Sequence, residues 1–202
     1  MLRRGVVYAF WLGVAGSVLL ALAAPPLLHH VGIEKALTDG ATAPLIVFSL
    51  SLTPYALSVA LSFWLEGLGR PGLVTVNMWV ANLINLAVNL LLVPGVMGLP
   101  ALGAVGAAWA TLVARSAFVI MLAVVIWRLK DARAMGVFDK PPRDRAAEKE
   151  QRRVGYGAGS SNLFEVSAFA GMSLVAGWLG GLNVAAWAVV LNVAGVIFMV
   201  PL

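Results

Sequence analysis

Long apolar stretches alternate with short polar connections along the whole chain. A helix that crosses a bilayer core about 30 Å thick needs about 20 apolar residues at a rise of 1.5 Å per residue. Stretches of about this length that carry almost no charge occupy residues 5–28, 41–65, 71–93, 101–127, 155–178 and 183–202. The pattern therefore predicts six transmembrane helices and an all-α integral membrane protein.

The stretch 71–93 is apolar but not uniformly so. Thr75, Asn82, Asn85 and Asn89 recur at near-helical spacing and fall on one stripe of the expected helix. Such amides either hold neighbouring helices together by hydrogen bonds or line a polar pocket. The spacing favours neither interpretation over the other.

The stretch 101–127 opens with small residues at every fourth position. Gly103, Ala107 and Thr111 form one ridge of a helix, and Gly106, Ala110 and Ala114 form a second. Ridges of this kind allow two helix backbones to approach closely inside a membrane. The sequence therefore predicts a tightly packed helix pair.

Three residues inside the predicted spans require an explanation. Pro54 lies at the centre of 41–65 among several hydroxyl side chains, and it predicts a static kink more readily than a moving hinge. Arg115 lies within 101–127. It marks either a functional site or, in the interpretation that we favour, a structural side chain that reaches toward the cytoplasmic end of its helix.

Glu165 is the third of these residues. It lies about ten residues into the stretch 155–178, close to the predicted midplane of the bilayer. A carboxylate at that depth is costly unless it is protonated, paired or bound to a cation. It therefore predicts a site at which a proton and a cation exchange, although a permanently protonated glutamic acid bonded to a facing helix would also satisfy the position.

Composition and charge agree with a membrane protein. Hydrophobic residues make up 61% of the chain and charged residues 11%, and the mean hydropathy is +0.93. The net charge of +5 is sorted by loop, which predicts an orientation in the membrane instead of a nucleic-acid partner. The segment 128–154 holds nine basic and five acidic residues and is predicted to be a cytoplasmic linker, with the amino terminus on the same side. No enzyme motif and no spacing of metal ligands was found, so neither catalysis nor a cofactor is expected.

Two segments resemble the multidrug and toxic compound extrusion (MATE) transporters. The first comprises Glu-Gly-Leu-Gly-Arg-Pro at 66–71, NLINLAVN at 82–89 and GLPALGAVGAAWAT at 98–111, and the second runs from 164 to 202. The resemblance implies helices three to eight of a two-lobed, twelve-helix transporter. Residues 1–127 would form four helices of the amino-terminal lobe, 128–154 the linker, and 155–202 the first two helices of a truncated carboxy-terminal lobe.

The resemblance also implies a function and a site. The expected function is secondary active efflux of organic, often cationic, compounds in exchange for protons or Na⁺ across a bacterial inner membrane. Glu165 would couple transport to the ion. The residues expected to line the substrate cavity are Asn85, Asn89, Thr111 and Asn192.

Two alternatives to efflux stay open. One is flipping of a lipid-linked oligosaccharide by a related member of the same superfamily, which the single intramembrane arginine disfavours. The other is a membrane fragment or subunit with no transport of its own, because the family comparison predicts further helices on both sides of this chain.

Overall fold

The computed structural model describes residues 2–30, 35–96, 98, 100–129, 137 and 145–199, and every regular element among them is an α-helix. The chain divides into two compact units, residues 1–141 and 142–202. The division falls inside the segment 128–154 that was expected to be a linker. Each unit is described by itself below.

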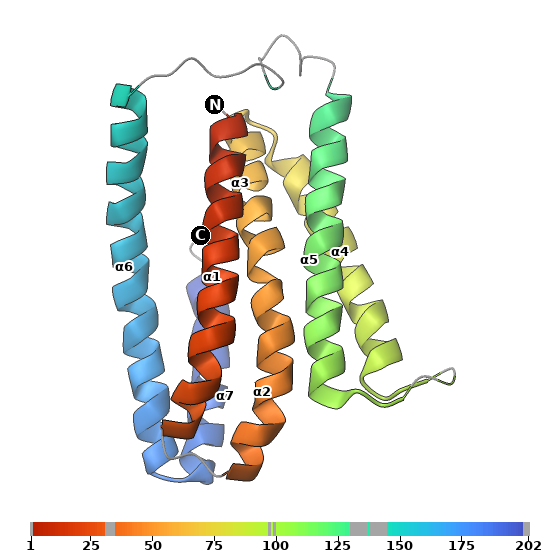
Figure 1. Cartoon of the computed structure of the whole chain (residues 1–202), viewed down its shortest axis with the longest axis vertical. Coiled ribbons are helices and arrows are strands. Elements are labelled where there is room, and N and C mark those ends of the chain that lie inside the picture. The colour runs from red at the N-terminus through yellow and green to blue at the C-terminus, as the bar shows by residue number, and fades with distance from the viewer. Residues whose placement is uncertain are drawn as a thin grey trace. The chain divides into compact units, whose positions relative to one another are not determined.

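The described residues of the first unit form five helices (Figure 1). They are α1 (Leu2–His30), α2 (Lys35–Leu50), α3 (Leu52–Gly67), α4 (Pro71–Leu92) and α5 (Gly103–Arg128). Helices α2 and α3 follow each other along one column, so the unit offers four segments that are long and apolar enough to cross a membrane. These segments are Leu2–Leu28, Gly40–Gly67, Pro71–Leu92 and Gly103–Arg128. They coincide with the first four predicted spans, and the all-α membrane fold is confirmed.

The column of α2 and α3 is interrupted at Ser51. The amide of Ser51 donates to the carbonyl of Phe48 at 3.0 Å, which is the tighter spacing of a 3₁₀ turn. Pro54 follows three residues later and has no N–H to offer the carbonyl of Leu50. The proline therefore interrupts the helix one turn ahead of itself, where the sequence predicted a kink.

Helix α1 packs closely against the start of α3. A Cβ atom at Gly13 would lie 2.6 Å from the Cα of Thr53, a distance that real side chains essentially never show. The hydroxyls of Ser17 and Thr53 lie 3.1 Å apart, within hydrogen-bond distance. A glycine and a polar pair thus hold these two helices together, as is usual where lipid replaces water.

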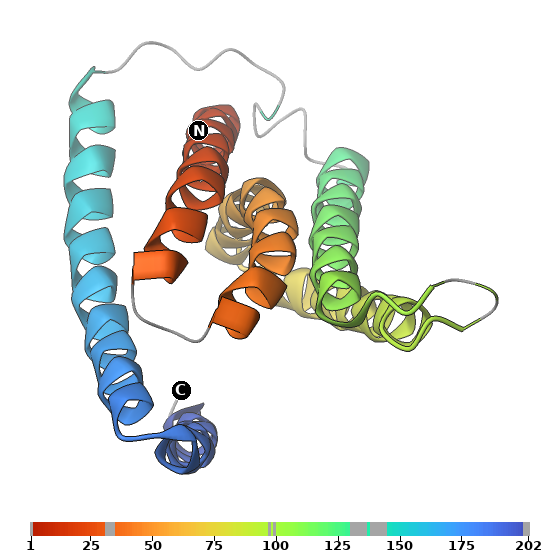
Figure 2. The same ribbon diagram turned by 60° about the horizontal axis from the view of Figure 1, so that its bottom comes forward.

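Helices α4 and α5 pack against each other and run in opposite directions (Figure 1), and they cross at an angle (Figure 2). A Cβ atom at Gly106 would lie 2.8 Å from the carbonyl oxygen of Leu92, so only glycine allows this approach. Gly106, Ala110 and Ala114 are all buried. The prediction of a closely packed ridge of small residues is therefore confirmed for the second ridge, Gly106, Ala110 and Ala114.

An apolar cluster stabilises one end of the first unit. Leu65 and Leu122 are completely buried in it, and Val74 and Ile126 pack beside them. The cluster joins the end of α3, the start of α4 and the end of α5, and it also includes Leu2 at the start of α1. Four chain segments are therefore anchored at the same end of the bundle.

The second unit contains α6 (Arg145–Trp178) and α7 (Gly181–Met199). They meet at Gly180, whose φ of 106° is one that L side chains rarely adopt. The indole N–H of Trp187 donates to the hydroxyl of Ser173 at 3.0 Å between the two helices. Neither helix is among the four segments above. Polar residues interrupt the apolar run of α6, and among the described residues α7 contributes a shorter apolar stretch, Gly181–Gly195. The last two spans remain predictions.

Candidate functional site

Two adjoining pockets run along one face of α5. Ala104, Thr111 and Phe118 line them and are spaced seven residues apart, which is about two helical turns and keeps them on the same stripe. The pocket near the start of α5 is closed on its other side by α2, and the pocket near the middle of α5 is closed by α4. Together they form what we call the α5 groove.

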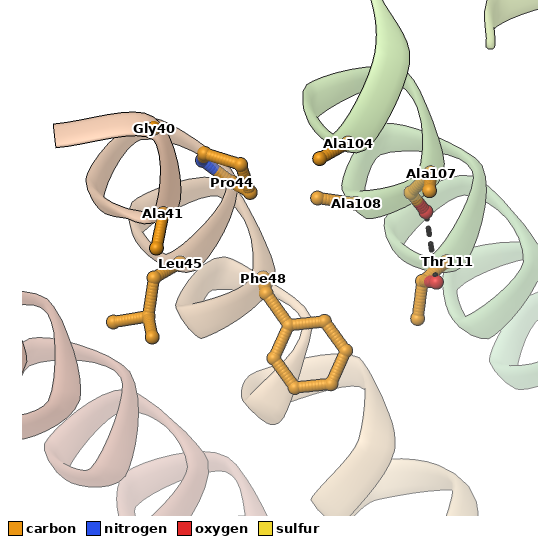
Figure 3. Close-up of a pocket in the computed structure, with 9 residues that line it drawn as sticks. All are labelled: Gly40, Ala41, Pro44, Leu45, Phe48, Ala104, Ala107, Ala108 and Thr111. Atoms are coloured by element: carbon orange, nitrogen blue, oxygen red, sulfur yellow. Dashed lines mark hydrogen bonds between the residues drawn. The ribbon is translucent and has the colours of Figure 1, made fainter. Parts of the chain in front are cut away.

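The α2 side of the groove is apolar. This pocket has a volume of about 470 Å³, and Figure 3 shows α2 side chains on one wall and small α5 side chains on the other. Its lining residues are Gly40, Ala41, Pro44, Leu45, Phe48, Ala104, Ala107, Ala108 and Thr111. A volume of this size with apolar walls suits the body of a small organic molecule.

The α4 side of the groove is more polar. This pocket has a volume of about 280 Å³. Its lining residues are Met78, Ala81, Asn82, Asn85, Thr111, Ala114, Arg115 and Phe118. Two asparagines of α4 and an arginine of α5 therefore border the same pocket.

Thr111 borders both pockets. Its hydroxyl donates to the carbonyl of Ala107 at 3.0 Å, which leaves its methyl group and the two lone pairs of its oxygen for the groove. The prediction that Thr111 lies beside a cavity agrees with this position. Thr111 and Ala107, which belong to the first small-residue ridge, thus line the groove.

Arg115 lies where α5 meets the interruption between α2 and α3. Its Nη1 donates to the hydroxyl oxygen of Ser51 at 2.7 Å, and Ser51 in turn donates to the carbonyl of Phe48. The guanidinium carbon lies 5.0 Å from the ring centre of Phe48 and 4.7 Å from that of Tyr55, both within the range of cation–π attraction. The side chain therefore points across to α2 and α3, and the expectation that it reaches along its own helix toward the cytoplasm is wrong.

The polar residues of the α4 stripe do not all have the same role: some line a pocket and others form hydrogen bonds within the helix. Asn82 and Asn85 line the polar pocket. The side-chain amide of Asn89 donates to the backbone carbonyl of Asn85 at 2.9 Å and to the side-chain oxygen of Asn85 at 3.0 Å. These hydrogen bonds fix the Asn85 side chain from one turn further along the helix. Thr75 donates to the carbonyl of Pro71. Of the two asparagines predicted for the cavity in this helix, Asn85 lines the groove directly.

The other two predicted site residues belong to the second unit. Glu165 is exposed on α6, thirteen residues before the helix ends at Trp178, so it lies in the helix interior. Asn192 is exposed on α7 and donates to the carbonyl of Ala188 at 2.8 Å. Their roles in coupling and in substrate binding remain predictions. Among the described residues no group of histidine and carboxylate side chains is arranged to hold a metal ion.

Sequence reasoning missed the residues that surround Arg115. Phe48, Ser51 and Tyr55 are spaced three and four residues apart, which would place them on one helical face. That spacing was a usable signal. The partner, however, lies 64 residues further along the chain, and no local pattern pairs the two.

Comparison with known proteins shows similarity along the entire chain. A protein of Caulobacter vibrioides named "Probable multidrug resistance protein NorM" is 63% identical over 202 residues, all of this chain and 43% of that protein. Proteins of the same name from Geobacillus kaustophilus and from Neisseria meningitidis are 31% and 29% identical over 211 and 203 residues. The resemblance to the MATE family is thereby confirmed.

The chain spans less than half the length of these MATE relatives, about 43–45% of each. No family model matches the chain. No solved structure matches it either. The similarity and the four apolar segments identify a multi-pass membrane protein related to multidrug resistance proteins, and the flippase alternative is not favoured.

Proposed function

We propose that this chain forms part of a secondary active multidrug exporter, which expels amphipathic organic compounds in exchange for protons or Na⁺. The observation that carries the proposal is the whole-chain similarity to proteins named for multidrug resistance. The α5 groove supports it, because a broad apolar pocket that joins a small polar one suits molecules with an apolar body and a polar end. An exporter has no bond to form or break, which fits an expected role without catalysis.

In this proposal the two units are the moving parts. The segment between them contains the division at residues 141 and 142. Secondary transporters commonly expose a fixed binding region to each side of the membrane by rocking one bundle against another. The first unit would carry the substrate in the α5 groove, and the second would carry the ion-coupling carboxylate.

Glu165 is the proposed coupling residue. It is the only acidic residue within the six predicted spans, and it lies in the interior of α6. A carboxylate in such a place releases its proton when a cation or a second charge takes over the stabilisation of the anion. Uptake of a proton or Na⁺ from one side and release to the other would then drive export.

The first experiment tests efflux. We would express the 202-residue chain alone, and also a chimera in which it replaces the matching 202 residues of the Caulobacter vibrioides relative, in bacteria that lack their own multidrug exporters. We expect the chimera to lower the accumulation of ethidium, and we expect this effect to disappear when the proton and sodium gradients are collapsed. Equal accumulation in cells with and without a membrane-inserted chimera would contradict the proposal. Efflux by the chain alone would exclude a fragment without transport of its own.

The second experiment tests coupling in the same chimera. Glu165→Gln preserves size and hydrogen bonding but cannot bind a cation as a carboxylate does. We expect ethidium accumulation to return to the level of cells without the chimera, while the amount of protein in the membrane stays unchanged. The control is Glu150→Gln on the same helix, which removes only an exposed ion pair with Arg153 at 3.8 Å. Undiminished efflux in Glu165→Gln would exclude the residue from coupling.

A further inference from the structure

The end of the first unit at which α1 begins is rich in arginine. Figure 1 shows the start of α1 and the ends of α3 and α5 at this end of the unit. Four arginines lie within about one helical turn of members of the apolar cluster that joins α1, α3, α4 and α5. They are Arg3, Arg4, Arg70 and Arg128. Glu66 is the one acidic side chain beside them among the described residues, so positive charge is in excess here.

The arginines lie at the depth of lipid headgroups when the unit spans a bilayer. Its four apolar segments begin or end beside them, at Leu2, Gly67, Pro71 and Arg128. Lipid phosphates lie where the hydrocarbon core gives way to water, so a guanidinium group at the end of an apolar helix can reach them. This depth favours a membrane lipid over an acidic protein or a nucleic acid as the partner of the excess charge.

Two of the four arginines are available to a ligand. Arg3 and Arg128 are exposed, and no carboxylate among the described residues forms an ion pair with either. Arg4 and Arg70 are partly buried and take part in other interactions. A guanidinium group presents a planar fork of N–H donors that matches two oxygens of a phosphate. Arg3 and Arg128 are therefore the side chains that can bind an anionic headgroup directly.

Each of these two arginines begins a stripe of exposed apolar side chains on its own helix. The members of a stripe are four residues apart, so they share one helix face and extend about 12 Å from the headgroup level into the hydrocarbon. A phospholipid has the same order of parts, with a phosphate above an acyl chain. The two stripes are Arg3, Val7 and Trp11 on α1, and Arg128, Val124 and Ile120 on α5.

We infer that this end of the first unit is a binding surface for anionic phospholipids, with one phosphate on Arg3, another on Arg128 and an acyl chain along each stripe. Phosphatidylglycerol has a net negative charge, whereas the choline group of phosphatidylcholine cancels the charge of its phosphate. The surface should therefore prefer phosphatidylglycerol. The inference concerns the contact between the chain and the membrane, and it does not depend on the proposed efflux function.

Fluorescence quenching by lipids measures this preference at each stripe separately. Because the chain has no cysteine, Trp11→Cys or Ile120→Cys provides a single thiol for a bimane fluorophore, two turns below Arg3 or Arg128. The labelled 202-residue chain is reconstituted into phosphatidylcholine bilayers, and the quencher is a nitroxide halfway along an acyl chain of phosphatidylglycerol or of phosphatidylcholine. We expect phosphatidylglycerol to bind about fivefold more tightly at each label, which corresponds to about 1 kcal/mol for one basic residue at the membrane surface.

Two variants that remove the same charge at the same end of the unit serve as controls for each other. Arg128→Gln should abolish the preference at the label on Ile120→Cys and leave it unchanged at the label on Trp11→Cys, and Arg3→Gln should do the opposite. Arg128→Lys keeps a positive charge at the same place and should retain most of the preference. Overall charge, reconstitution and folding act on both labels, so none of them produces a loss confined to one stripe.

A third label tests the other end of α1. Leu22→Cys replaces an exposed side chain about five turns from Arg3, and a label there should bind the two lipids equally. Equal binding of the two lipids at Trp11→Cys and Ile120→Cys would assign the arginines to water or to an acidic protein and overturn the inference. A loss of preference at both labels in either glutamine variant would also overturn it, because overall charge and not one arginine would then select the lipid.

Discussion

Arg115 shows how a charged residue is accommodated inside a helical bundle with no countercharge among the residues that the structure describes. The guanidinium group uses a hydroxyl and two aromatic faces, and these partners come from α2 and α3 at the interruption caused by Pro54. The interruption places Ser51 where it can accept from the arginine while it donates to Phe48. The proline and the arginine are thus parts of one arrangement, although no pattern in the sequence connects them.

Ser51 is the residue through which this arrangement can be tested. Ser51→Ala leaves one guanidinium donor without its partner, and we expect it to destabilise the protein by about 1.5–3 kcal/mol, the usual contribution of a hydrogen bond to a charged group. The measurement is the free energy of unfolding in mixed detergent micelles. Ser160→Ala is the control, since Ser160 is exposed and makes only a hydrogen bond to the carbonyl of Gly157 three residues earlier. Equal stability of the two variants would mean that the contact between Arg115 and Ser51 contributes nothing.

At the scale of helices, the two small-residue ridges of α5 have different roles. Gly106, Ala110 and Ala114 are buried, and only Ala114 of these also borders the groove, whereas Ala107 and Thr111 are partly exposed and both line it. Both ridges have the same spacing, and the sequence alone could not assign them. The difference arises because α4 approaches one side of α5 and leaves the adjacent stripe to the cavity.

Gly106 provides a prediction about this helix pair. Gly106→Ala would place a Cβ atom 2.8 Å from the carbonyl oxygen of Leu92, and backbone cannot yield as the end of a side chain can. We expect a loss of about 1–3 kcal/mol in unfolding free energy, typical of overpacking. Gly72→Ala in α4 is the control, because a Cβ atom there meets nothing within 4 Å. A thermal unfolding midpoint of Gly106→Ala at or above that of Gly72→Ala would show that the two helices are not closely packed at this point.

The sequence predicted elements better than it predicted contacts. Hydropathy located four membrane-crossing segments, and Pro54 indicated the interruption in the second, because both effects act within one or two helical turns. The groove could be anticipated only through Asn82 and Asn85, whose spacing allowed a polar pocket, and through Thr111, which the family resemblance supplied. The partners of Arg115 and the apolar wall on α2 depend on contacts between helices far apart in the chain, and these leave no periodic signature in a single sequence.

At the scale of the first unit, fold and charge distribution agree with each other. The apolar cluster of Leu2, Leu65, Val74 and Ile126 brings together the start of α1, the end of α3, the start of α4 and the end of α5. The basic residues next to these helix ends are Arg3, Arg4, Arg70 and Arg128. They are therefore gathered at one end of the unit, while the charge-free turn 94–100 lies at the opposite end of the α4–α5 hairpin. Positive residues on one side of a membrane indicate the cytoplasmic side.

This arrangement predicts the orientation of the protein, and the absence of cysteine makes it directly measurable. A single cysteine introduced by Val96→Cys, in the exposed turn between α4 and α5, should react with a membrane-impermeant maleimide in intact cells. Arg153→Cys, at an exposed position on α6, should react only after the membrane is permeabilised. The unmodified chain has no thiol and supplies the background for both measurements. The reverse labelling pattern would show that the orientation is the opposite of the predicted one. The basic end of the first unit would then lie outside the cell, contrary to the rule that positively charged residues stay on the cytoplasmic side.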